Sequence, residues 1–318
     1  MHEGQRVAQE ASRTKSEARP WGDDAETESF VSYWFGAPQR QMLAALAIAV
    51  ISVKSASVRL ALQVAISRII VTKTPQASLA ADTAHSRPHK VLNSSDYDVI
   101  SGFRGSVTRL ARLLDAREHI GSGEVILGDA RSLEGINENE ADLVVTSPPY
   151  LNALDYLRGH KLALVWFGYT TADLRQRRAN SIGTQRALLT ELAPDLLPIM
   201  KSMTSAVKTN DTLPTGMLRR YVVDCYGFVN QLARVLKPSG QAVLVVGNST
   251  IRGNYIRTDL AIQAVMELSG FKSISRYERP IPTTHRYMAI DPAHGSSTIQ
   301  NRMRTEVILT MGKQEQTL

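Results

Sequence analysis

The 318-residue sequence contains a single cysteine, Cys225. One thiol can form neither a disulfide framework nor a thiolate zinc site, and it fits a reducing compartment. Long apolar runs are also missing, because the longest, Met42 to Ile51, is too short to span a bilayer. Residues 1–30 are polar and lack the apolar segment of a signal peptide. We therefore expect a cytoplasmic protein.

Negative charge is in deficit. The 37 Lys and Arg residues exceed the 30 Asp and Glu residues, which gives a formal net charge of +7. An excess of this size makes a polyanionic partner plausible, although many soluble proteins are mildly basic. The hydrophobic fraction of 43% and the charged fraction of 21% are typical of a soluble globular chain.

The chain changes character along its length. Residues 1–29 are polar and predict a disordered tail, and residues 30–120 predict a helical segment with helices at 37–72 and 97–117. From residue 121 to 318, strands and helices alternate. The expected strands are 124–128, 141–146, 241–247, 273–279 and 305–311, and the expected helices are 153–167, 186–206, 217–236 and 257–269. This alternation predicts an α/β fold with a mostly parallel, doubly wound sheet, whose ligands bind beyond the carboxyl ends of the strands.

One strand end carries an unusual tetrapeptide. The apolar run Leu143–Val145 predicts a buried strand, and it runs through Thr146 into Ser147-Pro148-Pro149-Tyr150. Each proline fixes φ at about −65°, and neither can donate to a sheet ladder. The Ser147 hydroxyl and the Pro148 carbonyl are thus expected to be fixed acceptors beside the flat ring of Tyr150. A surface turn of the same sequence is the alternative.

Two fixed acceptors beside an aromatic ring suit a planar base with an exocyclic amino group. The nitrogen lone pair of such a group is delocalised into the base and is a poor nucleophile. Acceptors that hold the two N–H bonds out of the base plane favour a pyramidal nitrogen and restore the lone pair. Preorganised groups of this kind act through orientation and electrostatics, without a covalent enzyme intermediate.

The sequence TSPPY resembles motif IV of the amino-methylating DNA methyltransferases, which transfer a methyl group from S-adenosylmethionine to a base flipped out of the duplex. Family members that begin this motif with Ser mostly modify cytosine N4, and those with Asp or Asn mostly modify adenine N6. The resemblance implies Ser147, Pro148, Pro149 and Tyr150 as catalytic residues. It also implies a class I, Rossmann-like methyltransferase fold and double-stranded DNA as the partner.

Further stretches carry the same resemblance. In VILGDARSL, residues 125–133, a predicted strand ends at Gly128-Asp129, and the resemblance assigns cofactor contacts to Asp129, Ala130 and Thr146. Residues 232–249 resemble the helix, KPSG turn and fifth strand of the family. Residues 280–290 correspond to the loop of the family that contacts the target base. The stretches 86–91 and 150–169 resemble one bacterial subgroup. Residues 170–220 hold eight Lys or Arg against four Asp or Glu, and they are the candidate target-recognition insertion, with a solvated insertion as the alternative.

The glycine-rich cofactor motif of the family, similar to Asp-Pro-Phe-x-Gly-Ser-Gly after a first strand, has no counterpart in the sequence. That turn brings the backbone close to the cofactor, where a side chain would block it. The chain thus resembles a methyltransferase without its first two strands. It is interpreted as one half of a split enzyme, a truncated copy or a product of a misassigned start, and a complementing chain with the glycine-rich motif is the expected partner.

Three functional hypotheses remain from the sequence. The leading one is a site-specific cytosine-N4 DNA methyltransferase of the kind found in restriction-modification, which uses S-adenosylmethionine. The second is methylation of adenine N6 or of an RNA base, because the tetrapeptide recognises an amino group and not a polymer. The third is a non-catalytic DNA-binding remnant, which cofactor binding would distinguish from the other two.

Overall fold

The structure is a computed structural model that describes residues 1–14, 16–71, 75–81, 89–116, 121–151, 156–183, 192–205, 207, 213–251, 254–282 and 305–314. The chain divides into two compact units. The first comprises Met1–Gly123 and Asp155–Arg178, and the second comprises Glu124–Leu154 and Ala179–Leu318. The segment Asp155–Arg178 of the first unit falls inside the range that the sequence assigns to the catalytic domain.

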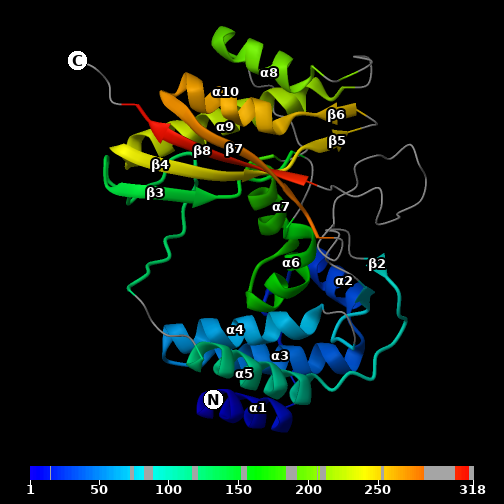
Figure 1. Ribbon diagram of the computed structural model, residues 1–318. Helices are drawn as coiled ribbons and strands as arrows, with labels where there is room; N and C mark the ends of the chain where they lie inside the picture. The colour runs from blue at the N-terminus through cyan, green and yellow to red at the C-terminus, as the bar shows by residue number, and fades with distance from the viewer. Residues whose placement is uncertain are drawn as a thin grey trace. The chain divides into compact units, whose positions relative to one another are not determined.

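The first unit is built from helices, drawn mainly in blue and cyan in Figure 1. They are α1 (His2–Arg13), α2 (Ala25–Trp34), α3 (Ala37–Ile51), α4 (Ala56–Ile70), α5 (Val99–Asp115), α6 (Tyr156–Leu164), the 3-10 helix η1 (Val165–Phe167) and α7 (Thr171–Asn180), with a two-residue ladder of β1 (Ala80–Ala81) and β2 (His89–Lys90). The last two residues of α7, Ala179 and Asn180, belong to the second unit. Side-chain caps fix three of the helix starts, and Ser55 accepts from the Val58 amide at 3.4 Å before α4. Asp24 accepts from the Thr27 amide at 2.8 Å before α2, and Asp98 accepts from the Ser101 amide at 3.0 Å before α5.

Helix α1 corrects the expectation of a disordered tail over residues 1–29. Its Val7, Ala8 and Ala11 are buried in the core of the helical unit, and Trp21 is buried there as well. These positions lie on one face of a helix, as an amphipathic helix requires. The composition gave a wrong expectation because small alanines and a single valine, rather than large apolar residues, make the contact.

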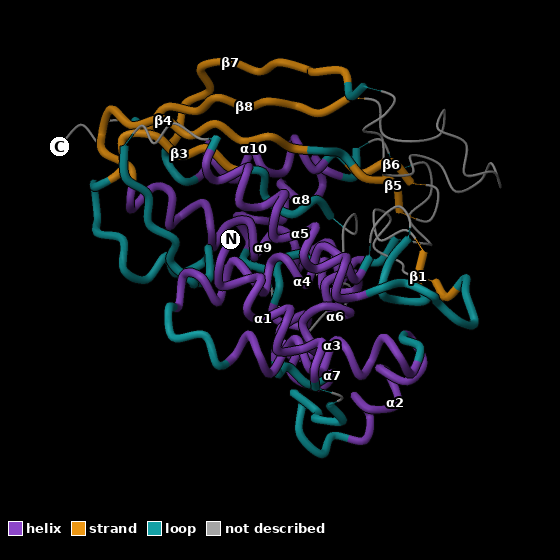
Figure 2. The backbone as a smooth tube through the Cα atoms, turned by 90° about the horizontal axis from the view of Figure 1, so that it is seen from below, coloured by secondary structure: helices purple, strands orange, loops and turns teal. Residues whose placement is uncertain are grey.

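The second unit contains a four-stranded sheet. Its strands are β3 (Ala141–Thr146), β4 (Leu236–Val246), β7 (Phe271–Pro280) and β8 (Thr305–Lys313), in the order β3-β4-β8-β7 (Figure 2). Strand β3 is parallel to β4, whereas β8 is antiparallel to both of its neighbours. The sequence prediction of these four strands is confirmed, including the closing antiparallel pair β7–β8. The described sheet is nevertheless mixed and not mostly parallel.

The strand expected at 124–128 is absent, and this prediction is wrong for the described structure. The residues have no strand assignment, and the Val125 and Leu127 side chains are 99% and 93% exposed. A strand exists only when its backbone pairs with another strand. No neighbouring strand lies beside 124–128 in the described part of the chain, so the apolar run remains an unpaired segment.

Helices cover one face of the sheet (Figure 1). They are α8 (Leu197–Met203), α9 (Thr215–Val235) and α10 (Thr258–Leu268), with the 3-10 helix η2 (Pro194–Leu196) before α8 and a small hairpin of β5 (Ser249–Ile251) and β6 (Asn254–Ile256). Ala242, Leu244 and Val246 of β4 are buried against these helices in one core. The predicted helix at 186–206 corresponds to α8 in its described part, and residues 184–191 lie outside the described residues.

Gly240 of β4 lies where the backbone of β3 and the start of β4 approach it closely. A Cβ atom there would lie 2.9 Å from Leu236 Cδ2, 2.9 Å from the Lys237 carbonyl and 3.2 Å from the Asp142 carbonyl. Two of these neighbours are backbone atoms and cannot rotate away. We expect Gly240→Ala to lower the free energy of unfolding by about 1–3 kcal/mol, the usual cost of overpacking. Urea denaturation followed by circular dichroism measures this loss. Gly270→Ala is not a suitable control because its positive φ adds separate strain, whereas Gly123→Ala, with no atom within 4 Å of the added Cβ, is expected to change little.

Candidate active site

The tetrapeptide follows directly from the parallel strand β3. Thr146, the last residue of β3, pairs with Leu244 of β4, and Ser147 begins the turn beyond it. The Ser147 Oγ atom lies 3.2 Å from the Val245 carbonyl and 3.5 Å from the Tyr150 hydroxyl. A serine hydroxyl has one proton and two lone pairs. Donation to the Val245 carbonyl therefore leaves the lone pairs of Ser147 as acceptors.

Two buried side chains fix the carbonyl groups of the turn. The Tyr221 hydroxyl of α9 donates to the Pro149 carbonyl at 3.2 Å, and the Ser249 hydroxyl of β5 donates to the Leu151 carbonyl at 2.6 Å. Burial raises the pKa of Tyr221 well above its usual value, so this hydroxyl stays protonated and remains a donor. The turn is thus held by the two proline rings and by donors from two separate elements.

The hydroxyl of Tyr150 is held from β8. It donates to Glu306 Oε1 at 3.1 Å, while the other oxygen of Glu306 accepts from Arg279 of β7 at 2.6 Å. The bond and the nearby charge of Glu306 raise the pKa of Arg279. The chain Arg279–Glu306–Tyr150 fixes the tip of the ring, and a fixed ring can offer a defined face to a planar group.

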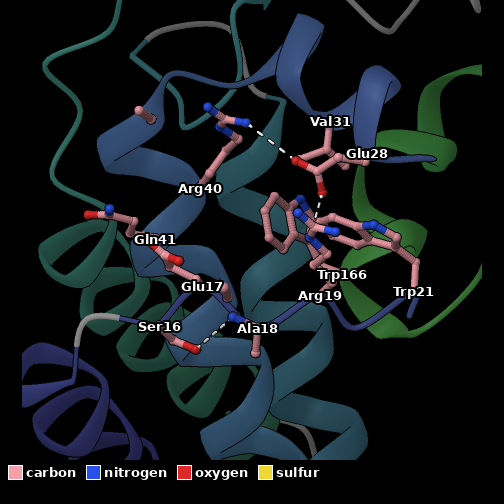
Figure 3. A pocket seen from close by; sticks show the side chains of 12 residues that line it. Ser16, Glu17, Ala18, Arg19, Trp21, Glu28, Val31, Arg40, Gln41 and Trp166 are labelled. Atoms are coloured by element: carbon pink, nitrogen blue, oxygen red, sulfur yellow. Dashed lines mark hydrogen bonds and ion pairs between the residues drawn. The ribbon is translucent and has the colours of Figure 1, made fainter. Parts of the chain in front are cut away.

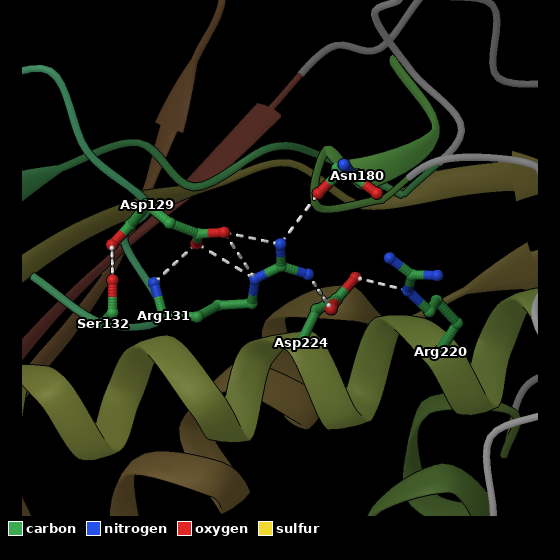
Figure 4. A network of polar contacts seen from close by, with 6 residues as sticks. All are labelled: Asp129, Arg131, Ser132, Asn180, Arg220 and Asp224. Carbon is green, nitrogen blue, oxygen red and sulfur yellow. Dashed lines mark hydrogen bonds and ion pairs between the residues drawn. The ribbon is translucent and has the colours of Figure 1, made fainter. Parts of the chain in front are cut away.

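Asp129 lies in a different polar network (Figure 4). Both of its oxygens accept from Arg131, with a shortest distance of 2.6 Å. Arg131 also donates to Asp224 of α9 at 2.7 Å and to the Asn180 carbonyl at 2.8 Å, and Asp224 accepts from Arg220 at 3.2 Å. The Arg131 bond lowers the pKa of Asp129, and the two carboxylates raise the pKa of Arg131.

The predicted site residues thus fall into two groups. Thr146 and the tetrapeptide are consecutive at the end of β3, where β4, β8 and α9 fix them. Asp129 and Ala130 belong to the turn that follows the unpaired segment 124–128, and the Asp129 carboxylate is 46% exposed. The target-base loop expected at 280–290 lies outside the described residues from 283 onward.

S-adenosylmethionine does not fit the described residues as a complete site. The Asp129 carboxylate, to which the family resemblance assigns a cofactor contact, is already engaged by Arg131 on both oxygens. The segment 124–128, which precedes Asp129, is exposed and pairs with no strand of the described residues, so it does not form one side of a cofactor pocket. The described residues therefore form a well-held turn at 147–151, and Asp129 and Ala130 do not form a complete cofactor site.

Several contacts escape prediction from the sequence. Glu306 and Tyr221 meet the turn across sequence separations of 156 and 72 residues, and no local pattern reveals such pairs. Arg220 and Asp224 are different, because charges four residues apart in a predicted helix are a recognisable ion pair. Their spacing is visible in the sequence itself.

A cavity of about 200 Å³ lies in the helical unit (Figure 3). The indole rings of Trp21 and Trp166 line it and meet edge to face at 5.4 Å. Glu28 is ion-paired with Arg19 at 3.3 Å and Arg40 at 3.7 Å, so the two guanidinium groups are partly neutralised. The cavity holds none of the predicted site residues and adds nothing to the chemistry of the tetrapeptide.

Comparison with known proteins supplies the family context. No protein-family model matches the sequence. M.BsoBI, a type II methyltransferase of Geobacillus stearothermophilus, is 24% identical over 174 residues, which is 46% of this chain and 34% of that protein. M.MvaI, a type II methyltransferase of Kocuria varians, is 23% identical over 188 residues, or 56% of this chain and 41% of that protein. The chain is distantly similar to type II DNA methyltransferases.

The similarity is partial in extent. M.AvaI of Nostoc sp. is 26% identical over 147 residues, which cover 41% of this chain and 30% of that protein, so the chain spans about a third of the length of these curated relatives. Among solved structures, TTHA0409 of Thermus thermophilus, named as a DNA modification methylase and complexed with S-adenosyl-L-methionine, aligns with a TM-score of 0.30 and 19% identity over 60% of this chain and 53% of that chain.

The helices of the described residues are all too short or too polar to cross a bilayer.

Proposed function

We propose that this chain is the base-binding part of a site-specific DNA methyltransferase that modifies an exocyclic amino group. One observation carries the proposal. At the carboxyl end of a parallel strand, the Ser147 hydroxyl donates its one hydrogen bond to the Val245 carbonyl, so its lone pairs can accept from an N–H donor. The distant similarity to type II DNA methyltransferases supports the same reaction class.

The residues of the turn have separate roles in this proposal. The Ser147 hydroxyl and the Pro148 carbonyl accept the two N–H bonds of the amino group and favour a pyramidal nitrogen. The ring of Tyr150, held by Glu306, stacks on the extruded base. Tyr221 is a positioning residue, because it touches the Pro149 carbonyl and not the base. The Ser at the start of the motif favours cytosine N4 over adenine N6.

The methyl donor of the proposed reaction is S-adenosylmethionine, with Asp129, Ala130 and Thr146 on the part of its site that this chain contributes. A glycine-rich turn outside the 318 residues, for example on a complementing polypeptide, completes that site. For Asp129 to accept from the cofactor, its bonds to Arg131 must be shared or lost, and Asp224 offers Arg131 a second partner at 2.7 Å.

The proposal predicts weak cofactor binding by the chain alone. Because the described residues provide only part of a cradle, titration calorimetry with S-adenosylmethionine is expected to give no saturation in the micromolar range, that is, a binding free energy weaker than about −8 kcal/mol. Tight binding would mean that the chain contains a complete site. It would also remove the reason for a complementing polypeptide.

Duplex DNA binding is expected to survive in this chain and to depend steeply on salt. The net charge of +7 and the basic excess of residues 170–220 motivate this expectation. The logarithm of the association constant should fall by about 0.9 per phosphate contacted for each decade of salt, so about six contacts lower affinity roughly 10³-fold between 50 and 200 mM salt. Fluorescence anisotropy with a labelled duplex measures the slope. An affinity independent of salt would exclude a phosphate-binding surface.

A non-catalytic DNA-binding remnant is the second candidate, favoured by the exposed and unpaired segment 124–128. The two candidates differ in one measurable respect. A component of an enzyme transfers a methyl group once its cofactor site is completed, to cytosine N4 or adenine N6 of DNA or to an RNA base. A remnant binds DNA and transfers no methyl group from radiolabelled cofactor under any such condition.

A further inference from the structure

The two edge strands of the sheet differ in how they are protected. The edge strand β7 carries Lys272, Arg276, Glu278 and Arg279, ends in Pro280 and has a register shift between Ser273 and Ser275. Charges, a proline and a bulge are the usual devices that stop an edge from pairing with another strand. Strand β7 is therefore built to remain an edge.

The edge strand β3 has such devices only at its ends, where the register shifts between Ala141 and Leu143 and where Pro148 and Pro149 follow the strand, and it has none over Leu143–Val145. It reads Ala-Asp-Leu-Val-Val-Thr, and its only charge is Asp142 near the start. The Leu143 and Val145 side chains are 54% and 68% exposed, while Val144 packs against the core below the helices. A continuous apolar run is typical of a strand buried on both faces with parallel neighbours on both sides. In the described residues β3 has such a neighbour on one side only, namely β4.

The exposed apolar surface extends across the helix-free face of the sheet. Pairing places Val145 beside Val243, Val245 beside Ile308, and Ile308 beside Tyr277 on this face. Tyr277 is 60% exposed. A helix alone could cover these side chains, but it could not pair with the backbone groups along the outer edge of β3, which no strand of the described residues meets. A strand is the element that can pair with them.

A second unpaired strand-like segment lies close in sequence. Residues 125–127 read Val-Ile-Leu, and the outer two are almost fully exposed. Between this segment and β3 the chain makes turns that contain the positive-φ residues Leu133 and Asn139. Within the described residues, segment 124–128 pairs with no strand and β3 pairs on one side only. This is the arrangement expected when a strand that would lie between two apolar segments is absent.

The charge around this edge is opposite to that of the whole chain. Residues 132–146 contain Glu134, Glu138, Glu140 and Asp142 but no Lys or Arg, in a chain of net charge +7. The three glutamates are exposed, and Glu140 accepts from the Asn137 amide at 2.8 Å. Among the described residues, only Asp142 of these four carboxylates has an ion-pair partner, Lys237 at 2.6 Å. Because these carboxylates precede or begin β3, a partner strand running parallel to β3 would meet them with its amino end.

We propose that the free edge of β3 and the segment 124–127 together form the docking surface for a polypeptide that donates a parallel β-strand. This strand is apolar on both faces and has Lys or Arg at its amino end, and a following helix covers Leu143 and Val145. The inference extends the proposed function by naming the surface on which the missing cofactor-site polypeptide docks. The test of the docking surface measures strand binding and not methyl transfer, so the docking proposal and the proposed function can fail separately.

The test is hydrogen exchange of the purified full chain, followed by mass spectrometry. The probe is a synthetic peptide of residues 241–246, the strand that already pairs in parallel with β3, preceded by two lysines. In the chain alone, exchange is expected to be fast in 124–128 and at the outward amides of β3. The peptide is expected to slow exchange in β3 about tenfold, equivalent to about 1.4 kcal/mol. The same peptide with proline at its centre should have no effect.

Matched variants test the charge argument without touching the apolar residues. Glu140→Lys should weaken binding of the lysine-bearing peptide, whereas Glu278→Lys on the opposite edge strand should not. Three results would overturn the proposal. The first is slow exchange in β3 without peptide, which would mean that the chain covers its own edge. The second is protection that rises with protein concentration, which would make a second copy of the chain the occupant. The third is equal or absent protection with the two peptides at millimolar concentration.

Discussion

In an enzyme reconstituted with the polypeptide that completes its cofactor site, Ser147→Ala is expected to lower the single-turnover rate of methylation about 100-fold. The reason is that Ser147 acts as an acceptor mainly when the amino nitrogen becomes pyramidal. Loss of one preorganised hydrogen-bonding group in a transition state typically costs about 10²–10³ in rate. The affinity for duplex DNA should change little, because the interaction is made in the transition state and not in the bound substrate.

Two further variants accompany this measurement, and the first of them is a control. Ser205→Ala removes an exposed serine hydroxyl of the same unit and should leave the rate unchanged. Tyr150→Ala should weaken binding of the extruded base by about 1–3 kcal/mol, the usual value of a base stacked on an aromatic ring. If Ser147→Ala methylates as fast as the parent enzyme, the tetrapeptide is a structural turn and the proposed chemistry is wrong.

Asp224→Ala is expected to lower the free energy of unfolding by about 3–5 kcal/mol, the usual cost of removing one partner from a buried ion pair. Its side chain is 5% exposed and pairs with Arg131 at 2.7 Å and Arg220 at 3.2 Å. The substitution leaves the Arg220 guanidinium, itself 10% exposed, without its carboxylate. It also releases Arg131 from α9 and loosens the turn that contains Asp129.

An exposed ion pair of the same chain is the matched control for this prediction. Asp142 pairs with Lys237 at 2.6 Å, but the Asp142 side chain is 82% exposed. Asp142→Ala should cost about 0–1 kcal/mol, as exposed pairs do. Urea denaturation of both variants gives the comparison. Equal losses would show that the network around Asp224 is not the anchor inferred from its burial.

Strand β3 and its tetrapeptide were predictable from the sequence because their signals are local. An apolar run followed by two prolines defines both the strand end and the rigid turn, and the structure has β3 over the expected residues. The direct contacts of the turn were not predictable, since Glu306 and Tyr221 approach from distant parts of the chain. Sequence periodicity carries no information about such pairs.

The failure at 124–128 has a different cause. Its apolar run is a good strand sequence, but a strand is a property of a pair of segments, and the described residues contain no partner for it. Val145 of β3 lies on the face of the sheet opposite the buried Leu244 and is 68% exposed. Within the described residues, the outer edge of β3 and the segment 124–128 have in common that no strand pairs with them.

Photo-cross-linking tests most directly whether Tyr150 receives the target base, and it needs only this chain and DNA. Duplex pools that carry 5-iodocytosine or 8-azidoadenine are irradiated with the protein, and the adducts are located by mass spectrometry. We expect an adduct at Tyr150, mainly from cytosine, which is lost in Tyr150→Ala and retained in Tyr226→Ala. Adducts confined to residues outside 146–151, in a protein that still binds the duplex, would contradict a role of Tyr150 in binding the target base.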